Sequence, residues 1–344
     1  MSRWAVILAG GVGSRFWPLS TPSSPKQLLA LVTKRPLLVD TVRRLAPSVP
    51  PSRTLVITNA TLAAAVRRAL PKLPKQNVIA EPKSAGTAPA LAWAAVEILR
   101  RDPGGTMLCV HADWSIADED GFRGALERAA DVAEQTQRLV TVGVVPTRPD
   151  PGFGYIRPGG AAGPEARRVE KFIEKPDRAT AAKLIAQGCL WNSGIFVWRA
   201  ADLVLEVRAH CPEVAVALPK AERGQLSAFF KGCIPISVDH GVLERSTKVL
   251  VVPGEFGWDD VGTWAALHRV RARDAADNAA AGDAHLVQAR GNVVHAEGHT
   301  VVLYGVDDLV VVARDGITLV TTREKAADLK TLVDALPPKV RERP

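Results

Sequence analysis

Short apolar runs alternate with helical patterns through the first 150 residues, and this alternation constrains the fold more than any other feature. Strands are expected at Trp4–Leu8, Thr54–Thr58, Asn77–Ala80, Met107–Val110 and Leu139–Val145. Nearly continuous apolar strands separated by helices are typical of a mainly parallel sheet that helices cover on both faces. The sequence therefore predicts an α/β fold whose ligands bind beyond the carboxyl ends of the strands.

Start and stop signals place two helices. The first is expected over 88–101, with Thr87 as its N-cap and Pro89 in the first turn, where its missing donor does no harm. The second is expected over 178–186, between Asp177 as its start signal and Gly188 as its stop signal.

The pattern changes beyond Phe153 to several short strands, among them 167–173 and 194–198. A polar, Ala-rich stretch at 271–282 is interpreted as a surface helix or a linker. Short alternating segments then predict a small all-β unit, and a final helix is expected over 325–336. The segments are 293–295, 300–303, 309–312 and 318–320. We therefore expect two domains, 1–270 and 283–336.

Composition excludes several classes of protein. No apolar run approaches the roughly 20 residues that a bilayer requires, and the first ten residues lack the features of a signal peptide, so a cytoplasmic location without membrane association is expected. The four cysteines form no CxxC pair and are expected to be buried thiols. The net charge of +8 comes from scattered basic pairs, which argues against nucleic acid and is compatible with attracting small phosphorylated substrates.

The first strand runs directly into a glycine-rich segment that predicts a phosphate site. Gly10, Gly11 and Gly13 allow the backbone to approach phosphate oxygens and donate its N–H groups to them. Arg15 and Lys26 add positive charge. Arg15 stands where a dinucleotide-binding loop would have a third glycine, which favours a triphosphate. A tight structural turn is the alternative.

The glycine-rich segment is part of the run AGGVGSRFWPLS, and Pro25–Leu29 read PKQLL. These segments and several later ones resemble motifs of the sugar-nucleotide pyrophosphorylases, and the PKQ form resembles the mannose-1-phosphate guanylyltransferase branch. The match covers roughly residues 4 to 264, and several motifs in one order are more specific than any one of them. The motifs are AGGVGSRFWPLS, PKQLL, Glu81-Pro82, 87–90, 152–156, 172–176, 191–196, 237–239 and 257–264. The resemblance implies a Rossmann-like nucleotidyltransferase domain with a small C-terminal unit similar to a left-handed β-helix.

The resemblance also implies the reaction. A guanylyl group would pass from GTP to α-D-mannose 1-phosphate, giving GDP-mannose and pyrophosphate by in-line attack on the α-phosphorus. Such a reaction needs a divalent cation and basic side chains to hold like charges together. The implied cofactor is Mg²⁺, and a homodimer is expected on the same resemblance.

Site residues are implied by the same matches. Asp113 and Asp260 would bind the metal ion. Arg15, Lys26 and Lys175 would be the catalytic cations, with Lys175 on the phosphate of the sugar. The nucleotide would be bound by Gly10, Gly11, Gly13, Ser14, Arg15, Lys26, Glu81, Thr87, Ala88 and Asp113. The sugar phosphate would be bound by Gly154, Tyr155, Glu174, Lys175, Asn192 and Asp239.

Alternatives remain for individual residues and for the whole chain. Asp113 could be a turn residue, Lys175 a surface cation and Asn192 a buried turn amide, whereas Asp259 is interpreted as a turn residue rather than a ligand. Trp114, Trp258 and Trp264 are expected to pack under loops. Another substrate pair, such as glucose 1-phosphate with dTTP, and a catalytically silent sugar-nucleotide sensor are the alternative functions.

Overall fold

The computed structural model of the chain describes residues 1–11, 14–21 and 24–341. The chain forms two compact units and passes between them several times. Unit 1 comprises residues 1–10, 42–112 and 118–257, and unit 2 comprises residues 11–41, 113–117 and 258–344. The domain boundaries expected from the sequence stay a prediction. Across the described ranges, no helix has both the length and the apolar character needed to cross a bilayer.

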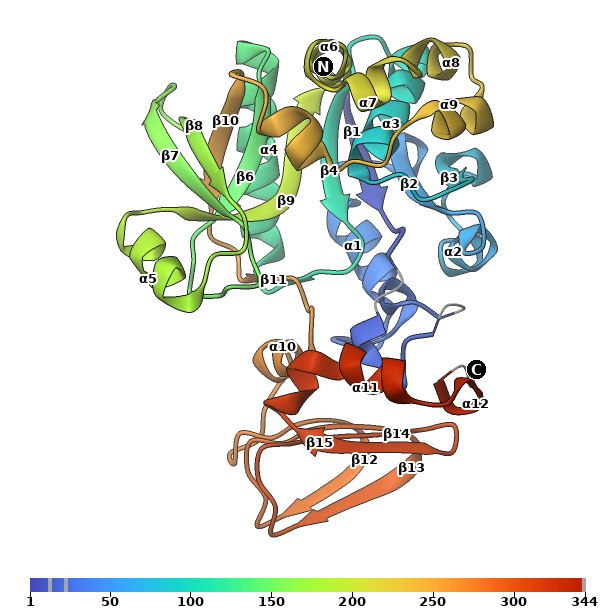
Figure 1. Cartoon of the computed structure of the whole chain (residues 1–344), viewed down its shortest axis with the longest axis vertical. Helices are drawn as coiled ribbons and strands as arrows, with labels where there is room; N and C mark the ends of the chain where they lie inside the picture. Colours follow the sequence, from blue (N-terminus) through green and yellow to red (C-terminus); the bar gives the residue numbers. More distant parts are fainter. Residues whose placement is uncertain (12–13, 22–23, 342–344) are drawn as a thin grey trace. The chain divides into compact units, whose positions relative to one another are not determined.

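Unit 1 contains a nine-stranded mixed sheet in the order β3-β2-β1-β4-β9-β6-β10-β8-β7 (Figure 1). The half around β1 is parallel, and β9 runs antiparallel between β4 and β6. The α/β prediction is confirmed, and the expected early strands are present within one residue at each end. The strands are β1 (Arg3–Leu8), β2 (Thr54–Asn59), β3 (Val78–Glu81), β4 (Thr106–His111), β6 (Leu139–Val144), β7 (Tyr155–Ala161), β8 (Arg167–Ile173), β9 (Leu190–Arg199) and β10 (Val249–Gly254).

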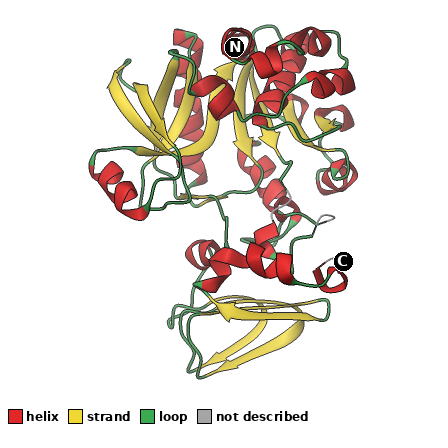
Figure 2. Cartoon of the chain, viewed as in Figure 1, coloured by secondary structure: helices red, strands yellow, loops and turns green. Residues whose placement is uncertain are grey.

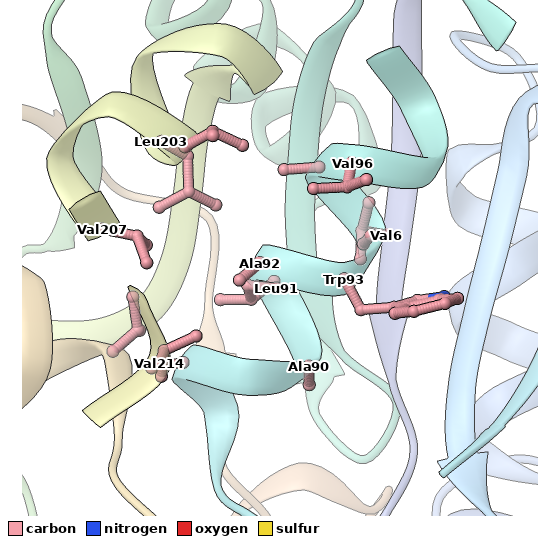
Figure 3. Close-up of a cluster of buried hydrophobic side chains, with 14 of the residues drawn as sticks. Val6, Ala90, Leu91, Ala92, Trp93, Val96, Leu203, Val207 and Val214 are labelled. Atoms are coloured by element: carbon pink, nitrogen blue, oxygen red, sulfur yellow. The ribbon is translucent and has the colours of Figure 1, made fainter. Parts of the chain in front are cut away.

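Successive side chains of the central strands are buried on both faces of this sheet because helices cover it. Val6 packs in the same cluster as α3 and α6, while the buried Ile7 beside it points to the opposite face. Figure 3 shows Leu91 of α3 facing Leu203 and Val207 of α6. The helices are α2 (Ala63–Ala69), α3 (Thr87–Arg101), α4 (Glu119–Thr136), α5 (Arg178–Ala186), α6 (Ala200–His210), α7 (Pro212–Ala215), α8 (Leu218–Glu222) and α9 (Leu226–Gly232), and α1 (Leu37–Leu45) spans the passage from unit 2 to unit 1.

The two helices expected from start and stop signals are confirmed, with one correction. Asp177 caps α5 by accepting a hydrogen bond from the Thr180 N–H at 2.7 Å. Thr87, however, is not an N-cap. It is the first residue of α3, the cap position is Gly86 with a φ of +87°, and the Thr87 hydroxyl accepts the N–H of Val238 at 2.8 Å instead.

Unit 2 contains a four-stranded β unit in the order β12-β13-β14-β15, with α10 and α11 packed against it (Figure 2). Of the two alternatives for 271–282, the helix is wrong. Residues 271–278 form a connection without helix or strand, β12 begins at Ala279, and Arg271 is buried rather than on the surface. The expected final helix is divided into a 3-10 turn, Lys325–Asp328, and α11. The elements are α10 (Trp264–Val270), β12 (Ala279–Val287), β13 (Val293–Tyr304), β14 (Leu309–Arg314), β15 (Ile317–Thr322), α11 (Leu329–Ala335) and α12 (Pro338–Arg341).

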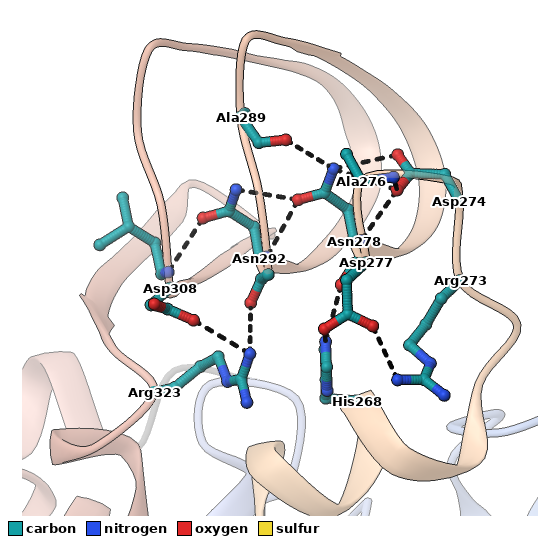
Figure 4. Close-up of polar contacts among 12 residues, drawn as sticks. His268, Arg273, Asp274, Ala276, Asp277, Asn278, Ala289, Asn292, Asp308 and Arg323 are labelled. Atoms are coloured by element: carbon teal, nitrogen blue, oxygen red, sulfur yellow. Dashed lines mark hydrogen bonds and ion pairs between the residues drawn. The ribbon is translucent and has the colours of Figure 1, made fainter.

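Buried asparagines connect successive turns of the β unit (Figure 4). The Asn278 Oδ1 accepts the backbone N–H and the side-chain amide of Asn292, each at 3.0 Å. The Asn292 Oδ1 in turn accepts the N–H of Leu309 at 2.9 Å. Since a buried amide is costly without partners, these bonds specify how the turns stack. Arg271 is satisfied similarly, through the Leu31 carbonyl at 2.7 Å and the His295 Nδ1 at 3.0 Å.

Candidate active site

Two very short antiparallel strands of unit 2 bring the predicted metal ligands to the same place. Strand β5 (Ser115–Ile116) pairs with β11 (Trp258–Asp259), and Asp259 lies opposite Ser115. Asp113 precedes β5 by two residues and Asp260 follows β11 directly. Because the strands are antiparallel, the start of one adjoins the end of the other. Asp113 and Asp260 therefore lie at one end of this small sheet, although they are 147 positions apart in the sequence.

Lys26 forms hydrogen bonds with both Asp113 and Asp260. Its Nζ donates to the Asp113 Oδ2 at 2.9 Å and to the main-chain oxygen of Asp260 at 2.6 Å. The side chain is only 7% exposed, so the ammonium is held away from bulk water. Pro25 introduces the 3-10 turn Lys26–Leu28 that places it. This lysine is thus not a solvated surface cation.

Negative charge on Asp260 is costly in its surroundings, and a bound cation would reduce that cost. Burial raises the pKa of its carboxyl, and the nearby Asp259 and Asp113 raise it further, whereas Lys26 acts in the opposite direction. The available donors are carboxylate and carbonyl oxygens, which hard cations prefer. Among the described residues no group of three or more His, Cys, Asp or Glu side chains is arranged to hold a metal ion. A cation here would need oxygens from a substrate as further ligands.

The glycine-rich segment is only partly described. Gly10, Gly11 and Arg15 are exposed, and Ser14 begins a 3-10 turn, Ser14–Phe16. Gly13 lies outside the described residues. The exposure of Arg15 leaves its guanidinium accessible to an anion.

Glu81, at the end of β3, is a buried carboxylate close to Gly10. A Cβ added to Gly10 would lie 3.6 Å from the Glu81 Oε2. Burial raises the pKa of the Glu81 carboxyl to about 7. Such shifts occur preferentially at functional sites. The neighbouring predictions Thr87 and Ala88 are engaged with another segment, since the Ala88 N–H donates to the Ile236 carbonyl at 3.2 Å.

Four of the predicted sugar-phosphate residues come together in unit 1. The Asn192 amide donates to the Asp239 Oδ1 at 2.8 Å, and the Asn192 N–H donates to the Gly154 carbonyl at 2.9 Å. A Cβ added to Gly154 would lie 2.9 Å from the Glu174 Oε2, so glycine leaves the space that this carboxylate needs. Burial raises the pKa of Asp239, and the Asn192 bond opposes that shift.

Lys175 is exposed and accessible to an anion, whereas Tyr155 is buried and does not fit its predicted role in binding the sugar phosphate. The Lys175 side chain is 65% exposed and pairs with Glu174 at 3.1 Å, on a backbone with a φ of +38°. The Tyr155 ring is fully buried. Its hydroxyl accepts the N–H of Asp150 and donates to the Asp150 carbonyl, each at 3.1 Å. The ring of Tyr155 therefore holds the turn at Asp150 and presents no surface to a substrate.

Sequence reasoning missed Arg148. Its guanidinium lies over the rings of Phe153 and Trp191, 5.4 and 5.0 Å from their centroids, and pairs with Asp150 at 2.9 Å. A single arginine in a proline-containing loop carries no signal of this packing. The tryptophan prediction is in line with the structure, since Trp114 and Trp258 pack edge to face at 5.9 Å and Trp264 packs on Phe16 at 5.4 Å.

Comparison with known proteins identifies the family. Residues 4–277 match the family described as Nucleotidyl transferase, and residues 282–336 match the MannoseP isomerase/GMP-like beta-helix domain. The chain is 38% identical over 352 residues to the mannose-1-phosphate guanylyltransferase of Escherichia coli K12, covering 97% of this chain and 73% of that protein. The chain belongs to the mannose-1-phosphate guanylyltransferase branch of the nucleotidyl transferases.

Two further proteins are similar to nearly the whole of this chain. The alginate biosynthesis protein AlgA of Pseudomonas aeruginosa is 35% identical, over 96% of this chain and 71% of that protein. A crystal structure described as mannose-1-phosphate geranyltransferase from Thermus thermophilus superimposes with a TM-score of 0.91 at 36% identity, covering 97% of this chain and 99% of that one. The resemblance inferred from the motifs is confirmed.

The raised pKa of Glu81 predicts a specific pH dependence of stability. Between the ordinary pKa of 4.5 and the folded pKa of about 7, the unfolded state loses a proton that the folded state retains, so stability falls as pH rises. Above pH 7 the penalty is constant, on the order of 3 kcal/mol. Glu81→Gln should therefore raise the unfolding free energy at pH 8 and leave it nearly unchanged at pH 4.5, as measured by urea denaturation. An equal effect at both pH values would contradict this origin of the shift.

Proposed function

We propose that this protein transfers the guanylyl group of GTP to α-D-mannose 1-phosphate and releases pyrophosphate, giving GDP-mannose. The observation that carries the proposal is the similarity along nearly the whole chain to proteins named mannose-1-phosphate guanylyltransferase. The grouping of Lys26, Asp113 and Asp260 supports it, because a transfer between two anions needs both positive charge and a metal-binding carboxylate pair.

Mg²⁺ fits the residues present. Asp113 and Asp260 would hold it, since they supply hard oxygen donors and their mutual repulsion is already compensated by an ammonium group. When bound, Mg²⁺ neutralises charge on the phosphates and so lowers the barrier to attack. Two protein carboxylates leave room for substrate oxygens, which is the usual arrangement for Mg²⁺ in phosphoryl-transfer sites.

The remaining charges are assigned to the phosphates. Lys26 and Arg15 would bind the phosphates of the nucleotide, and Lys175 would bind the phosphate of the sugar. A phosphate oxygen of mannose 1-phosphate then attacks the α-phosphorus, and the P–O bond to the leaving pyrophosphate breaks. The cations stabilise charge on the groups that approach and depart.

Neutral and acidic groups would select the substrates. The Glu174 and Asp239 carboxylates would accept hydrogen bonds from mannose hydroxyls beside Gly154, and the Asn192 amide would accept and donate. Ionised Glu81 would accept from the N1–H and N2–H groups of guanine, whereas Gly10, Gly11, Thr87 and Ala88 would contribute backbone contacts to the nucleotide. On the family resemblance we also propose that the protein forms a homodimer.

The decisive experiment is incubation with mannose 1-phosphate and each nucleoside triphosphate in turn, with pyrophosphate release as the readout. GTP should support the highest kcat/KM in the presence of Mg²⁺. A higher kcat/KM for glucose 1-phosphate with dTTP would replace the proposed substrate pair. Absence of turnover with every pair would favour the sugar-nucleotide sensor.

Asp260→Asn should lower kcat by about 100-fold or more, because it removes charge from the metal site without removing volume. Thermal unfolding should show that the variant is folded. Mg²⁺-dependent turnover near the parent's value would contradict the assignment of Asp260 as a ligand.

Lys175→Ala should raise the KM for mannose 1-phosphate by about tenfold and leave the KM for GTP nearly unchanged, because it removes a cation from only one phosphate. Lys171→Ala is the matched control, since Lys171 is an exposed lysine on the preceding strand, β8. A larger effect on the KM for GTP would show that Lys175 binds the nucleotide phosphates rather than the phosphate of the sugar.

A further inference from the structure

The turn that carries Asp260 contains an unfavourable backbone conformation. Val261, the next residue, has a φ of +47° and is fully buried. Branching at Cβ makes the left-handed region costly for valine, and such outliers persist only when surrounding contacts determine them. Something in unit 2 must therefore hold this turn.

The contacts that hold it come from Asp259 and Arg269. The Asp259 Oδ1 accepts the N–H of Val261 at 2.9 Å. The Asp259 Oδ2 receives the Arg269 Nε at 3.0 Å and the Arg269 Nη2 at 2.9 Å. Asp259 is only 5% exposed, and a buried carboxylate requires this degree of pairing. Arg269 is fixed on α10, whose start is capped by the Thr263 hydroxyl.

This turn also orients the carboxylate and the main-chain carbonyl of Asp260. The Asp260 Oδ1 accepts the N–H of Gly262 at 3.1 Å, and the main-chain oxygen of Asp260 accepts the Lys26 ammonium. A Cβ on Gly262 would lie 2.6 Å from the Asp260 Oδ2, so the carboxylate occupies space that glycine leaves free. A change in the backbone at Val261 would reorient this carboxylate.

We propose that Asp259 and Arg269 form a positioning pair that keeps the Asp260 carboxylate oriented for a divalent cation. The proposal rests on the proposed function, in which Asp260 is a metal ligand. Asp259 does not touch the cation itself. It acts through the Val261 N–H, and Arg269 holds the Asp259 carboxylate in place, as partners behind metal ligands commonly do.

Direct Mn²⁺ binding to the full chain in the presence of GTP, measured by electron paramagnetic resonance, tests this pair. Asp259→Asn and Arg269→Gln should each weaken Mn²⁺ binding by about 10- to 100-fold. Asp202→Asn is the matched control, because Asp202 is a similarly buried carboxylate paired with an arginine, Arg199, in unit 1. It should bind Mn²⁺ as the parent does.

The sign of the Arg269→Gln effect separates positioning from simple attraction. If Asp259 only attracted the cation by its charge, removal of Arg269 would make the site more negative and tighten Mn²⁺ binding. Unchanged or tighter binding would therefore overturn the proposal.

Replacing Val261 provides a test that does not depend on the charges. In the Asp259→Asn background, Val261→Gly should restore most of the lost affinity, because glycine adopts positive φ without a Cβ penalty. Val261→Ala also removes the two γ-methyl groups but keeps the Cβ, and should not restore the affinity. Equal effects of glycine and alanine would overturn the role of the turn.

Asp260→Asn distinguishes failure of this inference from failure of the proposed function. If Asp260→Asn abolishes Mn²⁺ binding while Asp259→Asn and Arg269→Gln do not weaken it, only the positioning pair is wrong. If Asp260→Asn leaves Mn²⁺ binding intact, Asp260 is not a ligand, and the positioning pair is overturned with that assignment.

Discussion

The pairing of two very short strands, β5 with β11, is the constraint on which the metal-binding part of the candidate site depends. This pairing brings Asp113, just before β5, close to Asp260, just after β11. The Lys26 ammonium donates to the side chain of Asp113 and to the main-chain oxygen of Asp260. Burial raises the pKa of the Asp260 carboxyl, and the neighbouring carboxylates of Asp259 and Asp113 raise it further, so negative charge is costly here. The compensating positive charge is therefore part of the structure, and a divalent cation would supply more of the same compensation.

Local sequence signals predicted most of unit 1 because its elements follow from periodicity and capping. The strands of the parallel half and the capped helix α5 appear where apolar runs and start and stop signals placed them. The failures have long-range causes. Residues 279–282 are rich in alanine, which favours helix, yet they pair with β13 and become a strand because the packing of the β unit outweighs local propensity. Thr87 bonds Val238 rather than capping its own helix, a contact between segments 151 residues apart.

The candidate site divides in the same way. Residue types and motif order named Asp113, Asp260 and Lys26 as candidates, and the family match confirms the resemblance that the motifs indicated. The contacts that hold these residues could not be read from the sequence. Asp259 and Arg269 are ten positions apart in different elements, β11 and α10, and the stacking of Arg148 on Trp191 depends on how a loop folds over β9. A burial-dependent property such as the raised pKa of Glu81 likewise exists only once the chain is folded.

The most direct test of the central claim, that Asp113 and Asp260 share one divalent cation, is anomalous scattering from crystals grown with GTP and Mn²⁺. We predict one strong anomalous peak within about 2.5 Å of an oxygen of each carboxylate, with nucleotide phosphate oxygens completing the coordination. Bound GTP with no peak at these carboxylates, or with the peak at another site, would contradict the claim.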